Sequence, residues 1–340
     1  MINQNNKKIS NGLNNKKILF SGIQPTGEIH IGNYLGAIKN WVELQNKGEY
    51  NCIYSIVDLH AITIDYDPKK YQETILDLAA TLIACGIDPK KSILLVQSNV
   101  KEHAELCWLL NTVTPVSELY RMTQFKDKSS KNEKNINIGL LDYPVLMSSD
   151  ILLYRSEVVP VGYDQSQHLE LTNIILKKFN NKFGEYFNKV NPYITTGAKI
   201  MALNDPEKKM SKSISGSYIS LSDTPDEIRK KISYAVTDSN ASKEMSLGVK
   251  NLFDLLLFFE AREAHDKFLK QYKDKTIKYS ELKSELADVI IKKLEPIQKK
   301  KKELLKSPKK LKSILADGAK QAQKIAYKNI LEIKKRMGLI

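Results

Sequence analysis

The sequence predicts an α/β protein, with a parallel sheet covered by helices on both faces and followed by a smaller all-α C-terminal domain. Three observations predict this fold class. Short apolar runs alternate with amphipathic stretches through the first half of the chain, which is typical of a parallel sheet with right-handed crossovers. A glycine-rich segment directly follows the first apolar run. From about Asp223 onward only helical patterns remain.

The first strand and the first helix are the clearest elements. Residues 18–23 form a short apolar run bounded by polar residues, as expected for a buried parallel strand. The helix after it is expected at about residues 33–45, because Leu35, Ile38 and Val42 fall on one face.

The later elements continue this alternation. Further strands are expected at residues 52–57, 92–96 and 158–161, and further helices at 68–84, 103–110, 144–153 and about 165–179. Pro68 stands near the start of its helix and Gly86 at its end, where these residue types are common. Between Arg121 and Asn137 a polar, lysine-rich stretch breaks the pattern, and we expect an inserted mobile loop there.

Four helices are expected after the sheet. They cover residues 225–236, 249–263, 279–305 with a bend at Pro296, and 308–337. Ser307 is a suitable N-cap for the last helix, and Pro308 and Gly338 suit its first turn and its C-cap. The chain is therefore divided into a disordered N-terminal extension (residues 1–16), an α/β domain (17–222) and a helical domain (223–340).

Composition excludes several classes of protein. The 340 residues are 42% hydrophobic, enough for a large domain with a smaller companion. No apolar run is long enough to span a membrane, and no presequence is recognisable, so a cytoplasmic protein is expected. Three cysteines without a Cys-x-x-Cys pair favour reduced thiols. His103 and Cys107 lie one helical turn apart, but two ligands alone do not make a metal site, so none is expected.

Positive charge is concentrated at the C-terminal end. The chain has a formal net charge of +14. Residues 291–340 hold sixteen Lys or Arg against four Asp or Glu, a net of +12, which leaves about +2 for the rest. This end is either a solvated helical surface or a contact surface for nucleic-acid phosphates, and charge alone does not decide between them.

The segment SGIQPTGEIHIGNYLGA, residues 21–37, joins the first strand to the first helix. A helix N-terminus at the C-terminal edge of a parallel sheet favours phosphate binding. Gly32 permits close backbone approach, and His30 can donate a hydrogen bond to a phosphate oxygen. The Walker A and G-x-G-x-x-G patterns are both absent from this segment. A structural turn without a ligand is the alternative.

A second segment, KKMSKS at residues 208–213, presents Lys209 and Lys212 among small hydroxyl side chains. Two mobile ammonium groups can hold a polyphosphate and stabilise charge on a departing pyrophosphate. Such residues are also common in solvated loops, so this segment alone does not indicate a site.

Together the two segments resemble the class I aminoacyl-tRNA synthetases, which have a His-Ile-Gly-His-like loop and a Lys-Met-Ser-Lys-Ser loop. Other segments are similar to the bacterial-type tryptophanyl branch of that family: DLHAIT (58–63), MTQFKDKS (122–129), GLLDYPVLMSSDILLY (139–154) and VPVGYDQSQHLE (159–170). The resemblance runs from about residue 17 to the end. Asn33 replaces the second histidine of the general pattern, as is typical of this branch.

The resemblance implies a Rossmann-like catalytic domain and a basic helical domain that recognises the anticodon. It implies an ATP-dependent ligase that converts L-tryptophan to tryptophanyl-adenylate and transfers it to tRNA(Trp). It also implies a homodimer, although the sequence shows no specific dimer surface. A tyrosyl-tRNA synthetase, a non-catalytic RNA-binding protein on the same scaffold and a small nucleotidyltransferase are the alternatives.

An amino-acid pocket is indicated by the residues themselves. Tyr143, Met147 and Asp150 are spaced i, i+4 and i+7, so they face one side of a helix. An ionised Asp150 suits the single N–H donor of an indole ring, and phenylalanine would leave it unpaired at a cost of roughly 1–3 kcal/mol. Alternatively, Asp150 bonds a neighbouring helix end. The resemblance adds apolar walls and two groups that orient the substrate: Phe20, His60, Val159 and Val161, with Gln24 and Gln165.

The resemblance also implies an ATP site. Its residues are Gln24, Pro25, Thr26, Gly32, Asn33, Gly162, Tyr163, Asp164, Ile200, Lys209, Met210, Ser211, Lys212 and Ser213. The catalytic contacts to the phosphates are expected from His30, Lys126, Lys209 and Lys212, with Mg²⁺ bound mainly through the ATP phosphates. Because the tryptophan carboxylate is already ionised at neutral pH, it can attack the α-phosphorus without a protein base.

Overall fold

The computed structural model describes residues 16–123, 136–162, 166–194, 200–212, 214, 216–238 and 244–340. Of the expected N-terminal extension only Lys16 is described, and most of the expected loop at 121–137 lies outside the described residues. No helix of the described part is long and apolar enough to cross a membrane.

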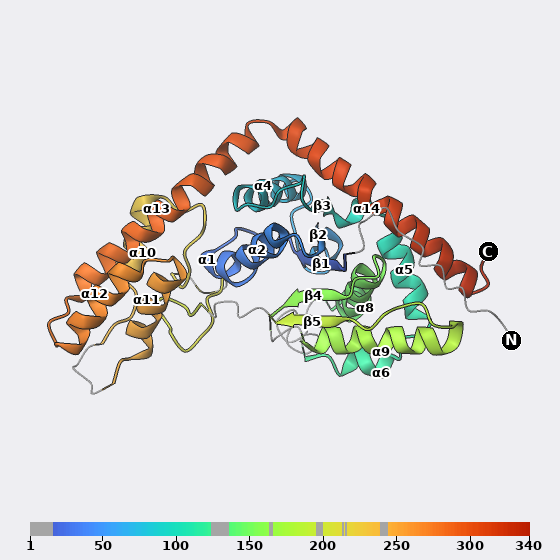
Figure 1. The fold of residues 1–340 in the computed structure, drawn as a ribbon, viewed down its shortest axis with the longest axis horizontal. Helices are drawn as coiled ribbons and strands as arrows, with labels where there is room; N and C mark the ends of the chain where they lie inside the picture. Colours follow the sequence, from blue (N-terminus) through green and yellow to red (C-terminus); the bar gives the residue numbers. More distant parts are fainter. Residues whose placement is uncertain are drawn as a thin grey trace.

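The core of the protein is a five-stranded, wholly parallel sheet (Figure 1). Its strands are β1 (Ile18–Ile23), β2 (Asn51–Ile56), β3 (Ile93–Val96), β4 (Val158–Val161) and β5 (Asn191–Ile194). The prediction of a parallel sheet is confirmed, with four strands in the expected places. β5 was not predicted, because Asn191 and Pro192 interrupt any apolar run at this edge of the sheet.

The strand order is β3-β2-β1-β4-β5, so the chain builds outward from β1 in one direction and then continues on its other side. Leu19 of β1 pairs with Val158 of β4, while Phe20 pairs with Ile53 of β2. Open α/β sheets bind ligands beyond the carboxyl ends of the strands where the order reverses. In this chain that point lies between β1 and β4.

Both faces of the sheet are covered, and alternate residues of β1 point to opposite sides. Leu19 belongs to a core that includes Leu78 and Leu82, whereas Phe20 belongs to a second core that includes Ile151 and Ile175. The helices of this part are α1 (Ile31–Asn33), a π-helical turn (Tyr34–Ile38), α2 (Lys39–Lys47), α3 (Asp58–Ala61), α4 (Tyr71–Ala84), a 3-10 turn (Gln97–Asn99), α5 (Glu102–Asn111), α6 (Val116–Tyr120), α8 (Ile138–Leu152) and α9 (Ser166–Phe183).

One helix boundary in this part was predicted too late. The helix expected at residues 144–153 begins at Ile138, where the Asn137 side chain accepts a hydrogen bond from the Leu140 N–H. Pro144 therefore lies inside the helix rather than at its start. The cap at Asn137 decides where the helix begins, and the proline is tolerated within it.

The C-terminal part is helical, as predicted. It contains α10 (Pro225–Ser233), α11 (Leu247–Phe258), α12 (Arg262–Lys273), α13 (Tyr279–Leu305) and α14 (Pro308–Arg336). The single helix expected at residues 249–263 is wrong, because Glu260 takes a left-handed backbone conformation, with φ of 64°, and ends the helical path. A separate helix, α12, starts two residues later.

The last helix returns to the sheet. α13 and α14 meet at an apex above α4, and α14 then descends beside β3 and α5 (Figure 1). Gly318 of α14 approaches β3 so closely that a Cβ there would collide with the Leu94 carbonyl oxygen. α14 thus covers the outer edge of β3, an edge that proteins commonly shield. The boundary at residues 222 and 223 stays a prediction.

Candidate functional site

A cavity of about 330 Å³ lies where β1 and β4 end, at the reversal of strand order. α3 and α8 complete its walls. The cavity brings together eight of the nine residues expected to bind the amino acid: Phe20, Gln24, His60, Tyr143, Met147, Asp150, Val159 and Val161. The ninth, Gln165, lies outside the described residues. Trp41 also lines the cavity and was not predicted.

The cavity has aromatic and apolar walls. The ring of Phe20 stacks on that of Tyr154, with a centroid distance of 5.8 Å and an interplanar angle of 18°. On the other side, His60 meets Tyr143 edge-on at 6.2 Å. Walls of this kind suit a flat aromatic guest, because ring pairs prefer offset-stacked or edge-to-face contact.

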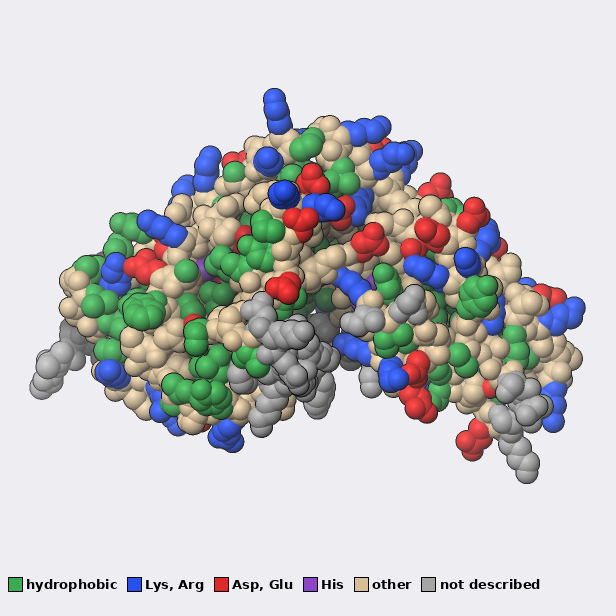
Figure 2. All heavy atoms as spheres, turned by 180° about the vertical axis from the view of Figure 1, so that it is seen from behind, with side chains coloured by type: hydrophobic (Ala, Val, Ile, Leu, Met, Phe, Trp, Pro, Cys, Tyr) green, Lys and Arg blue, Asp and Glu red, His purple; other side chains and the backbone are tan. Residues whose placement is uncertain are grey.

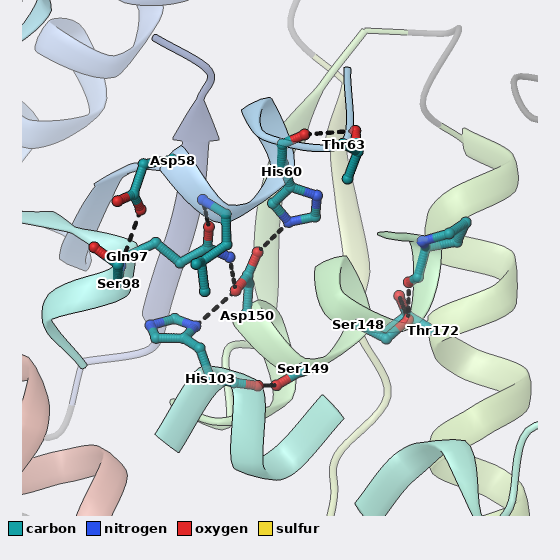
Figure 3. A network of polar contacts seen from close by, with 12 residues as sticks. Asp58, His60, Thr63, Gln97, Ser98, His103, Ser148, Ser149, Asp150 and Thr172 are labelled. Carbon is teal, nitrogen blue, oxygen red and sulfur yellow. Dashed lines mark hydrogen bonds and ion pairs between the residues drawn. The ribbon is translucent and has the colours of Figure 1, made fainter. Parts of the chain in front are cut away.

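Asp150 is the one carboxylate on the cavity wall, among the residues described, and it is only 1% exposed. Its Oδ1 lies 2.6 Å from Gln97 Nε2 and 2.6 Å from His103 Nδ1, and its Oδ2 lies 2.8 Å from His60 Nε2 (Figure 3). The alternative in which Asp150 bonds a helix end is therefore wrong, since its partners are three side chains.

These partners keep Asp150 ionised. Burial alone would raise its pKa, but the hydrogen bonds from His103 and His60 outweigh burial and lower the pKa to about 2. A carboxylate offers about four acceptor positions. Among the described residues, the three partners occupy two positions on Oδ1 and one on Oδ2, which leaves one on Oδ2 for a further donor.

The two signature segments face each other beside this cavity. Lys212 Nζ donates to the Thr26 carbonyl oxygen at 2.8 Å. The Ile31 N–H donates to the Ile219 carbonyl oxygen and the Leu221 N–H to that of Ile29, both at 2.9 Å. The structure therefore joins two segments that are far apart in the sequence.

His30 caps the helix that begins at Ile31. Its Nδ1 accepts from the Asn33 N–H at 3.3 Å, while Asn33 Oδ1 accepts from the His30 N–H at 3.2 Å. Burial lowers the pKa of His30 to about 4, with further contributions from Lys212 and Lys209. The imidazole is neutral at pH 7, and because Nδ1 is an acceptor, its proton is on Nε2.

Gly32 lies at a position where a side chain would not fit. A Cβ at this position would lie 2.8 Å from Cε1 of His30 and 2.9 Å from its Nδ1. It would also contact Met210 Cβ at 3.7 Å. The glycine therefore permits both the capping position of His30 and the approach of residues 208–212.

The other residues expected around ATP have varied positions. Ile200 and Met210 are buried and paired, with the Met210 N–H donating to the Ile200 carbonyl oxygen at 2.9 Å. Gln24, Thr26, Asn33, Gly162, Lys209 and Ser211 are at least partly exposed, whereas Pro25 is buried. Lys126, Tyr163, Asp164 and Ser213 lie outside the described residues.

Three residues around Asp150 were not predicted from the sequence: Gln97, His103 and Tyr154. Gln97 directly follows β3, so a polar residue at the carboxyl end of a predicted strand was the available signal. His103 was considered only together with Cys107, whose sulfur instead lies 3.6 Å from Asp142. No local pattern connects His103 with Tyr154.

Comparison with known families places this geometry in context. A family model described as tRNA synthetases class I (W and Y) matches residues 13–295. A "Tryptophan--tRNA ligase" of Helicobacter pylori is 49% identical over 331 residues, which cover 96% of this chain and 99% of the relative. That of Wolinella succinogenes is 48% identical over 328 residues, with the same coverage.

Solved structures agree in fold. The tryptophanyl-tRNA synthetase from Campylobacter jejuni, complexed with ADP and tryptophan, has a TM-score of 0.84 and 35% identity, and the match covers 94% of this chain and 99% of that one. A tyrosyl-tRNA synthetase from Archaeoglobus fulgidus has a TM-score of 0.65 at 18% identity, covering 85% and 91%. The second likeness concerns the fold alone.

Proposed function

Because the chain belongs to the class I tRNA synthetases (W and Y), we propose that its cavity at β1 and β4 activates tryptophan with ATP. Its function is that of a tryptophanyl-tRNA synthetase, which joins L-tryptophan to tRNA(Trp). The roles of individual residues are proposals, and one observation supports them most: among the described residues the cavity acid retains one acceptor position, and the two segments that carry His30 and Lys212 meet beside the cavity.

Tryptophan would enter with its indole between the walls of Phe20 and Tyr143. The indole ring has one donor and no ring acceptor, which matches the acceptor position on Asp150. A side chain without this donor would leave a buried carboxylate unpaired. Val159, Val161, Met147 and His60 would complete the pocket, and Gln24 and Gln165 would orient the amino and carboxylate groups.

ATP would be held between the two signature segments. The tryptophan carboxylate oxygen forms a bond to the α-phosphorus, and the bond from that phosphorus to the bridging oxygen of pyrophosphate breaks. His30 would donate from Nε2, and Lys209, Lys212 and Lys126 would stabilise the departing charge. In the second step, a ribose hydroxyl of the terminal adenosine attacks the carbonyl carbon and AMP leaves.

Mg²⁺ is proposed to enter with ATP. The described side chains that are proposed to contact the phosphates, Lys212, Lys209 and His30, are cationic or neutral donors. They suit phosphate oxygens, whereas Mg²⁺ is commonly bound through substrate phosphates and waters. The metal would supply charge neutralisation on the phosphates.

The basic C-terminal end is proposed to contact transfer RNA. Figure 2 shows Lys and Arg side chains along the top of the molecule, where α13 and α14 meet. A surface of this charge attracts phosphates. The helical part at residues 223–340 would carry the anticodon contacts.

A homodimer in the cytoplasm is also proposed. Large apolar side chains stand exposed on α5, on α6 and at the start of α8: Trp108 at 72%, Val116 at 57%, Tyr120 at 56% and Ile138 at 78%. Exposed apolar groups of this kind favour association. The three cysteines are free thiols, which is the state that a reducing compartment maintains.

Amino-acid-dependent exchange of labelled pyrophosphate into ATP tests the proposed chemistry. We expect exchange with tryptophan, and exchange at least about a thousandfold slower with phenylalanine at equal concentration, since sites that bond a substrate donor strongly reject analogues that lack it. Exchange with tyrosine should also be slower than with tryptophan, because its single ring carries its donor on a hydroxyl group in a different position. Faster exchange with tyrosine would contradict the pocket assignment. Binding of RNA without any exchange would contradict catalysis.

A further inference from the structure

A chain of contacts connects the cavity acid to the protein interior through residues that do not line the cavity. We propose that His103 and Tyr154 are positioning residues that hold the Asp150 carboxylate so that its remaining acceptor position faces the indole donor. The inference rests on the proposed function of Asp150 as the indole acceptor. It assigns tryptophan selectivity in part to two side chains that never touch the substrate.

The contacts form a linear chain from Tyr154 through His103 to Asp150. His103 Nε2 lies 2.7 Å from the Tyr154 hydroxyl, and His103 Nδ1 lies 2.6 Å from Asp150 Oδ1. His103 and Tyr154 are both fully buried, with 0% exposure. Neither residue is among those that line the cavity. Their polar atoms therefore serve each other and Asp150 rather than solvent or ligand.

The Tyr154 hydroxyl selects the tautomer of His103. Burial raises the pKa of Tyr154 well above its usual value, so the phenol stays neutral and can donate to Nε2. An imidazole that accepts at Nε2 carries its proton on Nδ1. That proton points at Asp150 Oδ1, where a lone pair would instead be repelled by the carboxylate.

A second contact fixes the helices that carry these groups. The Ser149 hydroxyl on α8 donates to the His103 carbonyl oxygen on α5 at 2.6 Å (Figure 3). Ser149 directly precedes Asp150 in the chain. The backbone beside the acid is therefore tied to the backbone of the histidine that bonds it, and the two side chains keep one mutual orientation.

Tyr154 supports the cavity in another way. Its ring stacks on Phe20, a cavity wall, at a centroid distance of 5.8 Å. One residue thus supports both the apolar wall and, through His103, the polar acceptor. The distance between wall and acceptor is the dimension that a bicyclic ring with one N–H must match.

Loss of the His103 donor should act on selection more than on catalysis. Gln97 would then be the only described donor to Oδ1, and the carboxylate could turn away from the cavity. A substrate that needs the acceptor would bind more weakly. A substrate of the same shape without a donor would lose nothing, since it never used that position.

The test compares tryptophan with 3-(benzothiophen-3-yl)alanine, in which sulfur replaces the indole N–H. In pyrophosphate exchange, we expect His103→Leu to raise KM for tryptophan roughly tenfold, the equivalent of one lost hydrogen bond to a charged group. The kcat for tryptophan should stay within about threefold, and KM for the analogue within about twofold. His103→Asn, whose amide can donate near the Nδ1 position, should restore most of the preference for tryptophan.

Two further variants keep the inference falsifiable if His103→Leu does not fold. Tyr154→Phe should reduce the preference for tryptophan over the analogue by roughly threefold, since it removes one neutral hydrogen bond. Tyr279→Phe, which removes a hydroxyl bonded to Asp238 in the C-terminal helical part at 3.0 Å, should leave the preference unchanged. Equal effects on both substrates, or no effect in either His103→Leu or Tyr154→Phe, would overturn the proposal. Failure of wild-type exchange with tryptophan would instead overturn the proposed function.

Discussion

At the scale of single residues, the proposed ATP site depends on where positive charge and neutral donors are placed. Burial lowers the pKa of Lys212, and its Nζ donates a hydrogen bond to the Thr26 carbonyl oxygen. His30 is kept neutral in the same neighbourhood by burial and by Lys212 and Lys209. The site thus combines cations that can approach a polyphosphate with an imidazole that donates without adding charge.

Lys212→Ala should lower the rate of adenylate formation at least tenfold, because an ammonium group that stabilises departing charge is typically worth at least this much. Tryptophan affinity should change little, since Lys212 is not part of the cavity wall. Pyrophosphate exchange and tryptophan binding by calorimetry measure the two quantities.

Lys208→Ala is the matched control within the same segment. Lys208 is exposed and pairs with Asp205 at 2.6 Å, so exchange should stay within about twofold of wild type. An exchange rate near wild type for Lys212→Ala, or equal losses in both variants, would contradict the assignment.

His30 should make the protein less stable as the pH falls. Its pKa is about 4 in the folded protein against an ordinary value of 6.5, so the unfolded chain binds a proton between these values and the folded chain does not. The free energy of unfolding should therefore fall between pH 6.5 and pH 4, by roughly 2–3 kcal/mol from this group. Urea unfolding at several pH values measures it.

His30→Asn is the control, because asparagine can cap the helix without titrating. The loss of stability between pH 6.5 and pH 4 should be smaller in this variant than in wild type. Identical pH profiles would show that His30 does not titrate as the structure indicates.

At the scale of elements, α14 packs closely against β3 because residue 318 has no side chain. A Cβ there would collide with the Leu94 carbonyl oxygen, so Gly318→Ala should push the helix off the strand. We expect the free energy of unfolding to fall by about 2 kcal/mol or more, as for other overpacked sites. Ala316→Val adds bulk on the exposed face of the same helix and should cost less than about 1 kcal/mol. Urea unfolding measures both free energies, and an equal loss in the two variants would contradict this packing argument.

Most elements could be predicted from local patterns, and the exceptions have physical reasons. The predicted ranges 18–23 and 279–305 matched the observed bounds. A short apolar run marks the first, and a long helical pattern of apolar residues marks the second. β5 and α12 were not predicted because the first has almost no apolar run and the second begins after a left-handed turn at Glu260. The capping pair of His30 and Asn33 was partly visible as a helix start.

The candidate site was predicted less completely. Residues of one helix, such as Tyr143, Met147 and Asp150, could be placed on one face by their spacing. The partners of Asp150 come from α3, α5 and the turn after β3, and only the folded sheet brings these together. Sequence spacing contains no information about such contacts between distant segments.

At the scale of the whole molecule, exposed positive charge is concentrated where α13 and α14 meet. Seven lysines at the junction of α13 and α14 are exposed and have no ion pair or side-chain hydrogen bond within the described residues: Lys299, Lys300, Lys302, Lys306, Lys309, Lys310 and Lys312. Lys301, between them, pairs with Asp77 of α4 at 2.8 Å. The junction is therefore anchored at one lysine and free to attract phosphates at the others.

Substitution of Lys299, Lys302, Lys306 and Lys309 by glutamine should weaken the salt dependence of KM for transfer RNA. Removal of each lysine that binds a phosphate should reduce the log–log salt slope by about one unit. Pyrophosphate exchange without transfer RNA should be unchanged, and it serves as the control. An unaltered slope in aminoacylation assays across a salt series would assign these lysines to an ordinary solvated surface.

The return of α14 to β3 also determines the order in which the protein can be completed during translation. The ribosome releases β3 long before it releases α14, so the outer edge of β3 stays uncovered until the last helix has been synthesised. A nascent chain that stalls after α13 would expose that edge to neighbouring chains, and premature termination near the end of the message should yield an aggregating product rather than a shortened enzyme.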